Sequence, residues 1–306
     1  LGTGGMVAVL SFTRSYWLII PIVIGFSFFN APIIPLVDTS VLSMLGEHRD
    51  QYGKQRMWGA IGWGIAGPIA GWLVGIYGIL AAFPAYLILL SMEFVPGYFL
   101  HVVKPEQGPP FWSGLRGLLA DRRWYVFLLV IFLGGTGLSI VTNYLFLFMS
   151  ELNATSAMMG VSLAAATLSE IPVLFFSGQM LRRWGPRGVL VLSLAAYVLR
   201  ALGYSIATQP WQAVALQAFH GLSFSALWVA GVSYANELAP KGLGATAQGI
   251  FSSTVMGLGG ISGAVLGGVL LDRFGGAGVF RISAAIVFLG LLLFLAAGKS
   301  LRRESA

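Results

Sequence analysis

Residues 124–148 read WYVFLLVIFLGGTGLSIVTNYLFLF, an apolar stretch that contains no charged side chain. A helix needs about 20 such residues to cross the hydrocarbon core of a bilayer. Similar stretches recur along the whole chain, and together they predict nine spans. The spans run over 16–42, 57–76, 79–101, 124–148, 156–180, 188–207, 210–236, 244–270 and 278–298. The sequence therefore predicts an all-α polytopic membrane protein.

The basic residues lie almost entirely on one side of this series of spans. Fourteen of the 18 Lys and Arg residues fall in alternate connections and in the C-terminal tail. These segments are 46–56, 102–123, 181–187, 237–243 and 299–306. Because cytoplasmic loops are enriched in Lys and Arg, we expect these segments and the C-terminus to face the cytoplasm. The expected location is the cell membrane.

The composition narrows the possible partners. Charged residues make up 9% of the chain and hydrophobic residues 57%, and the mean hydropathy is +0.83, unlike a soluble domain. The net charge of +7 is dispersed among the connections, which favours anionic lipid over nucleic acid as its partner. There is no cysteine, so neither a disulfide nor a thiolate metal site is expected. We predict no cofactor and no metal.

The two ends of the first predicted bundle suggest how the chain is divided. Residues 1–12 are apolar, and we interpret them as the last turns of an earlier helix, which makes the chain an N-terminally truncated one. A genuine nine-span protein is the alternative. The long connection 102–123 separates three full spans from six, and its Pro and Gly residues break any continuing helix. Within it, 111–119 is predicted to form a short amphipathic helix along the inner membrane surface.

An eight-residue pattern recurs three times, with Gly first, an aromatic residue seventh and Gly eighth. It reads GWLVGIYG from Gly71, GQMLRRWG from Gly178 and GVLLDRFG from Gly268. The second and third copies lie 90 residues and three spans apart, so three-helix units recur in alternating orientation. Internal inverted repeats of this kind are typical of secondary transporters.

The last two copies also resemble the loop signature of the major facilitator superfamily, whose members have twelve helices in two six-helix halves. The resemblance implies a major facilitator fold with nine of its twelve helices present. On that template, residues 1–101 are the remainder of the N-terminal bundle and 102–123 the central cytoplasmic loop. Residues 124–306 are then the C-terminal six-helix bundle.

Three consecutive spans each carry one ionisable residue near the bilayer midplane. At 1.5 Å per residue, Glu170 and Arg200 lie roughly 17 and 18 Å from the inner boundary, and His220 roughly 15 Å from the outer one. A charge at that depth is costly and is usually paired and functional. Each residue alone also fits a structural role, such as a hydrogen bond between helices or neutralisation of Glu170 by Arg200. Together they predict a proton-coupling site.

A second candidate site lies around the first predicted cytoplasmic loop. Asp38 follows two prolines in the first span, and Arg56 and Trp63 lie seven residues apart, on one helix face. A guanidinium paired with a carboxylate beside an indole can hold a polar, ring-shaped ligand. The alternative is a loop salt bridge, with Trp63 facing lipid or packing on a neighbour. We predict Asp38, Arg56 and Trp63 as substrate-binding residues.

These residues carry a more specific resemblance. The segments PLVD at 35–38 and YGKQRMWGAIGW at 52–63 resemble the oligosaccharide–proton symporters of the lactose permease group and the phenylpropionate-transporter-like branch. The resemblance implies that the positions of Asp38, Arg56 and Trp63 carry the acid, the arginine paired with it and the indole that stacks on a sugar.

Further along the chain, the resemblance both supports the proton site and departs from it. VLR at 198–200, followed by His220, matches the coupling arginine and the histidine of that group. Ser223, however, stands where the group has its proton-accepting glutamate, and the group's acid in the eighth helix aligns near Thr167, one turn from Glu170. A relocated carboxylate at Glu170 is the hypothesis that restores coupling.

The sequence thus predicts a secondary active transporter that carries a small polar organic solute with protons. A sugar or glycoside, an aromatic acid and a nucleoside remain open as solutes, and we expect a monomer. The alternative function is a non-transporting membrane sensor or scaffold that retains the fold. An enzyme is not expected, because HExxH, GxSxG and phosphate-loop motifs are missing from the sequence.

Overall fold

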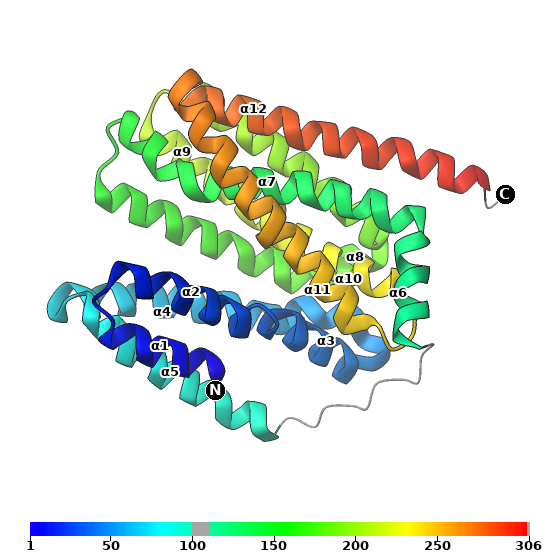
Figure 1. Cartoon of the computed structure of the whole chain (residues 1–306). Coiled ribbons are helices and arrows are strands. Elements are labelled where there is room, and N and C mark those ends of the chain that lie inside the picture. The colour runs from blue at the N-terminus through cyan, green and yellow to red at the C-terminus, as the bar shows by residue number, and fades with distance from the viewer. Residues whose placement is uncertain (100–109, 305–306) are drawn as a thin grey trace. The chain divides into compact units, whose positions relative to one another are not determined.

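The computed structural model describes residues 1–99 and 110–304, and within these ranges the secondary structure is helical, without a strand (Figure 1). The all-α class predicted from the sequence is confirmed. The chain divides into two compact units. The first comprises Leu1–Met44 and Gly62–Lys104, and the second comprises Leu45–Ile61 and Pro105–Ala306. The division at 101 and 124 that the family resemblance implies stays a prediction.

In the first unit, the N-terminal helix packs on two others. Helix α1 (Gly2–Phe12) contacts α2 (Tyr16–Asn30) and α5 (Ala82–Phe99). The glycine contacts show how close α1 comes, since a Cβ atom on Gly25 of α2 would lie 2.9 Å from the sulfur of Met6. Residues 1–12 are therefore helical, as expected. The other elements that lie wholly or partly in this unit are α3 (Ile33–Leu45), α4 (Tyr52–Tyr77) and η2 (Ile79–Ala81).

The second unit holds the longest helices. Helix α7 (Arg122–Glu151) packs on α12 (Gly260–Glu304), and α8 (Ser156–Ile206) packs on α12 and on α10 (Ala226–Leu238). In Figure 1 the C-terminal end of α12 lies at the same end of this unit as α6. The remaining elements are η1 (Gly46–Gln51), the start of α4, α6 (Phe111–Ala120), α9 (Pro210–Leu216), η3 (Gln217–Phe219), η4 (Gly221–Ser225), α11 (Gly244–Ser252) and η5 (Ser253–Gly259).

The glycine at the eighth position of each repeat copy forms a backbone corner. Gly78, Gly185 and Gly275 have φ values of 79°, 65° and 66°, in the left-handed region that residues with a Cβ rarely adopt. Gly185 breaks α8 and Gly275 breaks α12 into two legs each. A glycine in this conformation is a common helix stop. The repeat recognised in the sequence therefore corresponds to a recurring turn.

Several predicted connections are more helical than expected. Helix α4 begins at Tyr52, so Lys54 and Arg56 lie on the helix and not in a loop. Residues 181–187 are helical apart from the corner at Gly185. Hydropathy marks where a helix leaves the hydrocarbon core of the membrane. The helix itself can extend further, because its backbone hydrogen bonds also form outside the core. The short helix predicted at 111–119 is confirmed as α6.

Long apolar helices account for the membrane prediction. In the described ranges, five helical stretches are long and apolar enough to cross a membrane, and two of them contain the corners at Gly185 and Gly275. The count of nine spans stays a prediction. The stretches are Tyr16–Tyr77, Arg122–Glu151, Ser156–Ile206, Pro210–Leu238 and Gly244–Ala297.

Small residues bring helices of the second unit into backbone contact. A Cβ atom on Gly259 would lie 2.8 Å from the carbonyl carbon of Gly135, so neither position has room for a side chain. Next to them, the Ser139 hydroxyl donates a hydrogen bond to the Gly260 carbonyl at 2.7 Å. Such contacts are typical of membrane helices.

Candidate functional site

An acid and an imidazole meet inside the second unit. Oε1 of Glu170, on α8, lies 3.5 Å from Nε2 of His220, and both side chains are largely buried. The Ser225 hydroxyl donates to Oε2 of Glu170 at 2.8 Å. The contact becomes an ion pair only when His220 is protonated. Two of the three residues predicted for proton coupling are thus brought together, although their role in coupling is untested.

A π-helical segment positions these groups. His220 precedes η4, and both Ser223 and Ser225 lie within it. Its first residue, Gly221, donates its backbone N–H to the Ser169 hydroxyl at 2.9 Å, and a Cβ atom on Gly221 would collide with the Ser169 carbonyl. The glycine therefore lets this segment approach the backbone of α8 beside Glu170. Single π-helical turns are frequent at functional sites.

Arg200 is the third predicted coupling residue, and it is 1% exposed. Its Nε donates to the Tyr204 hydroxyl and its Nη1 to the Ser223 hydroxyl, both at 3.0 Å. Its Nη2 donates to Oε1 of Gln217. In the described part of the chain, no carboxylate forms an ion pair with this guanidinium, so Arg200 does not neutralise Glu170 directly. Ser223 links Arg200 to the backbone of His220, since its hydroxyl also donates to the His220 carbonyl at 3.1 Å.

Sequence reasoning missed the neutral residues that surround Arg200. Tyr204 lies one helical turn further along α8. Gln217 is 4% exposed and donates from Nε2 to the Ser162 hydroxyl at 2.9 Å. The spacing of four between Arg200 and Tyr204 is a signal that could have been used, because such residues are neighbours on a helix. Gln217 lies three residues before His220, and only the fold shows that it faces Arg200.

The predicted substrate-binding residues fall in different units. Asp38 is 4% exposed and Trp63 is 70% exposed, and both lie in the first unit. Arg56 lies in the second, where its guanidinium carbon is 5.2 Å from the centroid of the Trp228 ring. The pairing of Asp38 with Arg56 and the stacking role of Trp63 stay predictions.

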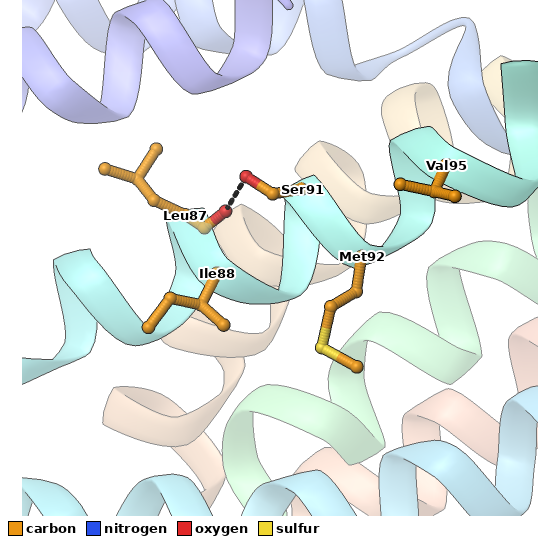
Figure 2. A pocket seen from close by; sticks show the side chains of 5 residues that line it. All are labelled: Leu87, Ile88, Ser91, Met92 and Val95. Carbon is orange, nitrogen blue, oxygen red and sulfur yellow. Dashed lines mark hydrogen bonds between the residues drawn. The ribbon is translucent and has the colours of Figure 1, made fainter.

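A surface pocket and the possible metal ligands are the two other features that bear on a site. Figure 2 shows a pocket along α5, lined by Leu87, Ile88, Ser91, Met92 and Val95. Its one hydroxyl, on Ser91, donates to the Leu87 carbonyl of the same helix at 2.8 Å, so the pocket offers little to a polar solute. In the ranges that the structure describes, His, Asp and Glu side chains form no group of three that could hold a metal ion.

Known proteins resemble the chain over most of its length. The model of the MFS_1 like family matches residues 5–282. Maltose permease of Geobacillus stearothermophilus is 27% identical over 286 residues, which are 93% of this chain and 73% of the permease. Major facilitator superfamily domain-containing protein 6-like protein A of Xenopus laevis is 26% identical over 296 residues. That match covers 92% of this chain and 49% of the frog protein, so the chain spans about half of its length.

A solved structure shares the fold. A mutant form of the nucleoside transporter NupG matches with a TM-score of 0.67, covering 96% of this chain and 80% of that one. The sequences are only 19% identical, so the likeness concerns the arrangement of helices alone.

Proposed function

Because the chain belongs to the MFS_1 like family, and thus to the superfamily that its sequence resembles, we propose that it is a secondary active transporter. In this proposal it works by alternating access and carries a small polar organic solute together with protons. The matched maltose permease is a transporter and not an enzyme, which supports the class of function.

The contact between Glu170 and His220 carries the proposal of proton coupling. A carboxyl group held 3.5 Å from an imidazole gives the membrane-spanning bundle two neighbouring groups that can each bind and release a proton. A scaffold has no reason to keep ionisable side chains at that depth, where they are costly.

Arg200 supplies a permanent positive charge in the same bundle. Its hydrogen-bond partners are the neutral side chains of Tyr204, Ser223 and Gln217, so no ion pair within the described ranges cancels this charge. Movement of the guanidinium toward Glu170 would favour the carboxylate, and movement away would favour the protonated acid. Alternating access that shifts Arg200 relative to Glu170 would therefore take up a proton on one side and release it on the other.

For the solute, a sugar or glycoside is the first choice. The supporting observation is the likeness to a maltose permease over 93% of this chain. Asp38, Arg56 and Trp63 are the proposed binding residues, and an aromatic acid or a nucleoside would use the same combination of ring stacking and charged hydrogen bonds.

The test uses the natural protein that contains this chain, reconstituted in proteoliposomes with an imposed proton gradient. Uptake of radiolabelled maltose, 3-phenylpropionate and uridine is measured with and without a protonophore. Glu170→Gln is expected to abolish gradient-driven accumulation and to retain counterflow exchange, because the solute site remains but no proton is carried. Glu47→Gln, at an exposed position of η1, is the matched control and is expected to accumulate solute normally.

Two results would contradict the proposal. Gradient-driven accumulation in Glu170→Gln would show that another group couples transport, and Glu93, part-way along α5, would be the next candidate. Binding of a solute without any exchange would favour the sensor or scaffold alternative.

We also propose that the protein is a monomer in the cell membrane, with segments 46–56, 102–123 and 299–306 in the cytoplasm. The chain has no cysteine, so a single cysteine introduced at position 107 can be labelled without background. This position lies outside the described residues. Labelling of intact cells by an impermeant thiol reagent is expected to fail, and success would reverse the proposed orientation.

A further inference from the structure

The guanidinium of Arg56 lies over the indole ring of Trp228, a residue that was not predicted as part of a site. The distance of 5.2 Å from its guanidinium carbon to the Trp228 ring centroid is within the roughly 6 Å at which a cation is attracted to an aromatic face. Both residues belong to the second unit, Arg56 near the start of α4 and Trp228 on α10. The contact therefore joins two helices that are far apart in the sequence.

Trp228 is enclosed but not hydrogen-bonded. It is 1% exposed, and its ring packs edge-on against Phe251 at a centroid distance of 5.4 Å. Its Nε1 has no hydrogen-bond partner in the part of the chain that the structure describes, whereas a buried indole N–H usually finds one. No hydrogen bond fixes this ring, and Arg56 lies over its face.

A series of ring contacts connects Trp228 with the acid–imidazole pair. Trp228 lies 6.2 Å from Phe224, whose ring stacks on His220 at 5.3 Å with an interplanar angle of 25°. His220 in turn lies 3.5 Å from Glu170. Its Nδ1 is buried and has no hydrogen-bond partner in the described ranges. The guanidinium of Arg56 and the carboxyl group of Glu170 are thus the two ends of one continuous set of contacts.

We propose that Trp228 is a positioning residue for Arg56. Its ring holds the guanidinium while no solute is bound and releases it when oxygen atoms of the solute accept the guanidinium N–H groups. Because Trp228 and His220 both pack on Phe224, departure of Arg56 from the ring changes the packing of His220 against Glu170. Solute binding is thereby transmitted to the proton site. This inference rests on the proposed function, in which Arg56 binds the solute.

The contact itself is tested in solute-free protein, without any transport assay. Mono-, di- and trifluorotryptophan are introduced at position 228, since fluorine withdraws electron density from the ring face while it preserves the shape of the ring. The rate of phenylglyoxal modification at Arg56 is followed by peptide mass spectrometry. We expect the rate to rise with each fluorine, by roughly 2- to 30-fold in total, which corresponds to the range measured for cation–π contacts.

Trp124 is the matched control. It is 0% exposed and its Nε1 also lacks a hydrogen-bond partner in the described ranges, yet no cation is recorded over its ring there. The same fluorinated residues at position 124 are expected to leave the rate at Arg56 unchanged. Equal rates across the series at position 228, or an equal rise in the Trp124 series, would show that the Trp228 ring does not hold the guanidinium of Arg56.

The positioning role is then tested with proteoliposomes and radiolabelled maltose, 3-phenylpropionate and uridine. Trp228→Leu is expected to change the half-saturating concentration of the transported solute and to lower the number of protons carried with it, and Trp228→Tyr is expected to restore both in part. Unchanged values in Trp228→Leu would overturn the role. If the unmodified protein transports none of the three but the fluorine series behaves as expected, the contact stands and its role toward these solutes is overturned.

Discussion

Two of the arginines on helix α8 are held in opposite ways. Arg182 is 61% exposed and pairs with the carboxylate of Asp50, whereas Arg200 is 1% exposed and is surrounded by neutral acceptors. An exposed ion pair contributes roughly 0.2–1 kcal/mol, because water and salt screen it. A buried charge must instead have each of its donors satisfied, since an unpaired one costs more than the bond is worth. We therefore expect the strength of a contact on this helix to follow its burial and not the charge of its partner.

The contrast also bears on function. The charge of Arg182 is cancelled where it stands, next to the corner at Gly185. The charge of Arg200 is solvated by neutral groups and is not cancelled by an ion pair with any described residue. A guanidinium of this second kind can act on a proton site or a solute when the helices move.

The largest effect should come from removing a neutral partner of Arg200. Gln217→Leu would leave Arg200, the Tyr204 hydroxyl and the Ser162 hydroxyl each without one partner, at a cost of about 3 kcal/mol. Thermal unfolding in detergent measures the loss. Gln55→Leu, at an exposed position of α4, is the control and should be nearly neutral. If both variants unfold alike, the buried network is not what stabilises this region.

The next test changes the backbone contact that places the network. Gly221→Ala would push a methyl group into the Ser169 carbonyl, and since backbone cannot yield easily, we expect a loss of about 2 kcal/mol. Gly249→Ala, on α11 with open space around it, should be neutral or stabilising, because alanine favours a helix. An equal response at the two glycines would show that the close approach of η4 to α8 does not matter for stability.

Asp121 offers an intermediate case, since it is a half-buried ion-pair partner that also caps a helix. Its carboxylate accepts the Arg123 backbone N–H at 2.8 Å and pairs with the guanidinium at 2.9 Å. Partial burial raises the pKa of Asp121, but the hydrogen bonds from Arg123 outweigh it, so the pKa is lowered. Asp121→Ala is expected to cost about 1 kcal/mol.

The pH dependence separates the two roles of Asp121. Because its folded-state pKa is lowered, its charge-dependent contribution is complete above the unfolded value of about 3.9 and is lost as the pH falls through the lower folded value. Asp121→Asn keeps a capping side chain but cannot titrate, so its unfolding should lose this dependence. A steep acid dependence that persists in the Asn variant would assign the effect to another group.

The smallest effect is expected at the exposed end of the comparison. A double-mutant cycle with Asp50→Asn and Arg182→Gln should give a coupling free energy below about 1 kcal/mol, and it should shrink further in concentrated salt. Thermal unfolding at two salt concentrations measures it. A coupling as large as the Gln217→Leu effect would erase the distinction between the two arginines.

How much of this structure the sequence could predict depends on what can be learned by counting residues along a helix. Counting gives depth, and it predicted one level for Glu170 and His220, which lie 3.5 Å apart in the structure. It gives rotation only for a regular α-helix, so it could not show that Gln217 faces Arg200 or that Trp228 lies beneath Arg56. The turn at Gly185 could be predicted from the repeat, because a glycine that recurs at this spacing commonly adopts the left-handed backbone conformation that ends a helix. The partnership of Gln217 with Arg200 could not, because no charge or motif marks it.

The π-helical segment η4 has a consequence for the evolution of this helix. A π turn behaves as an α-helix with one residue inserted, and one residue corresponds to about 100° of rotation around the axis. The π turn absorbs that rotation locally, so deletion of a single residue from 221–225 would restore regular winding and leave everything beyond it, Trp228 included, facing the same side as now. Regular α winding that kept all five residues would instead turn the side chains of α10 by about 100° relative to His220.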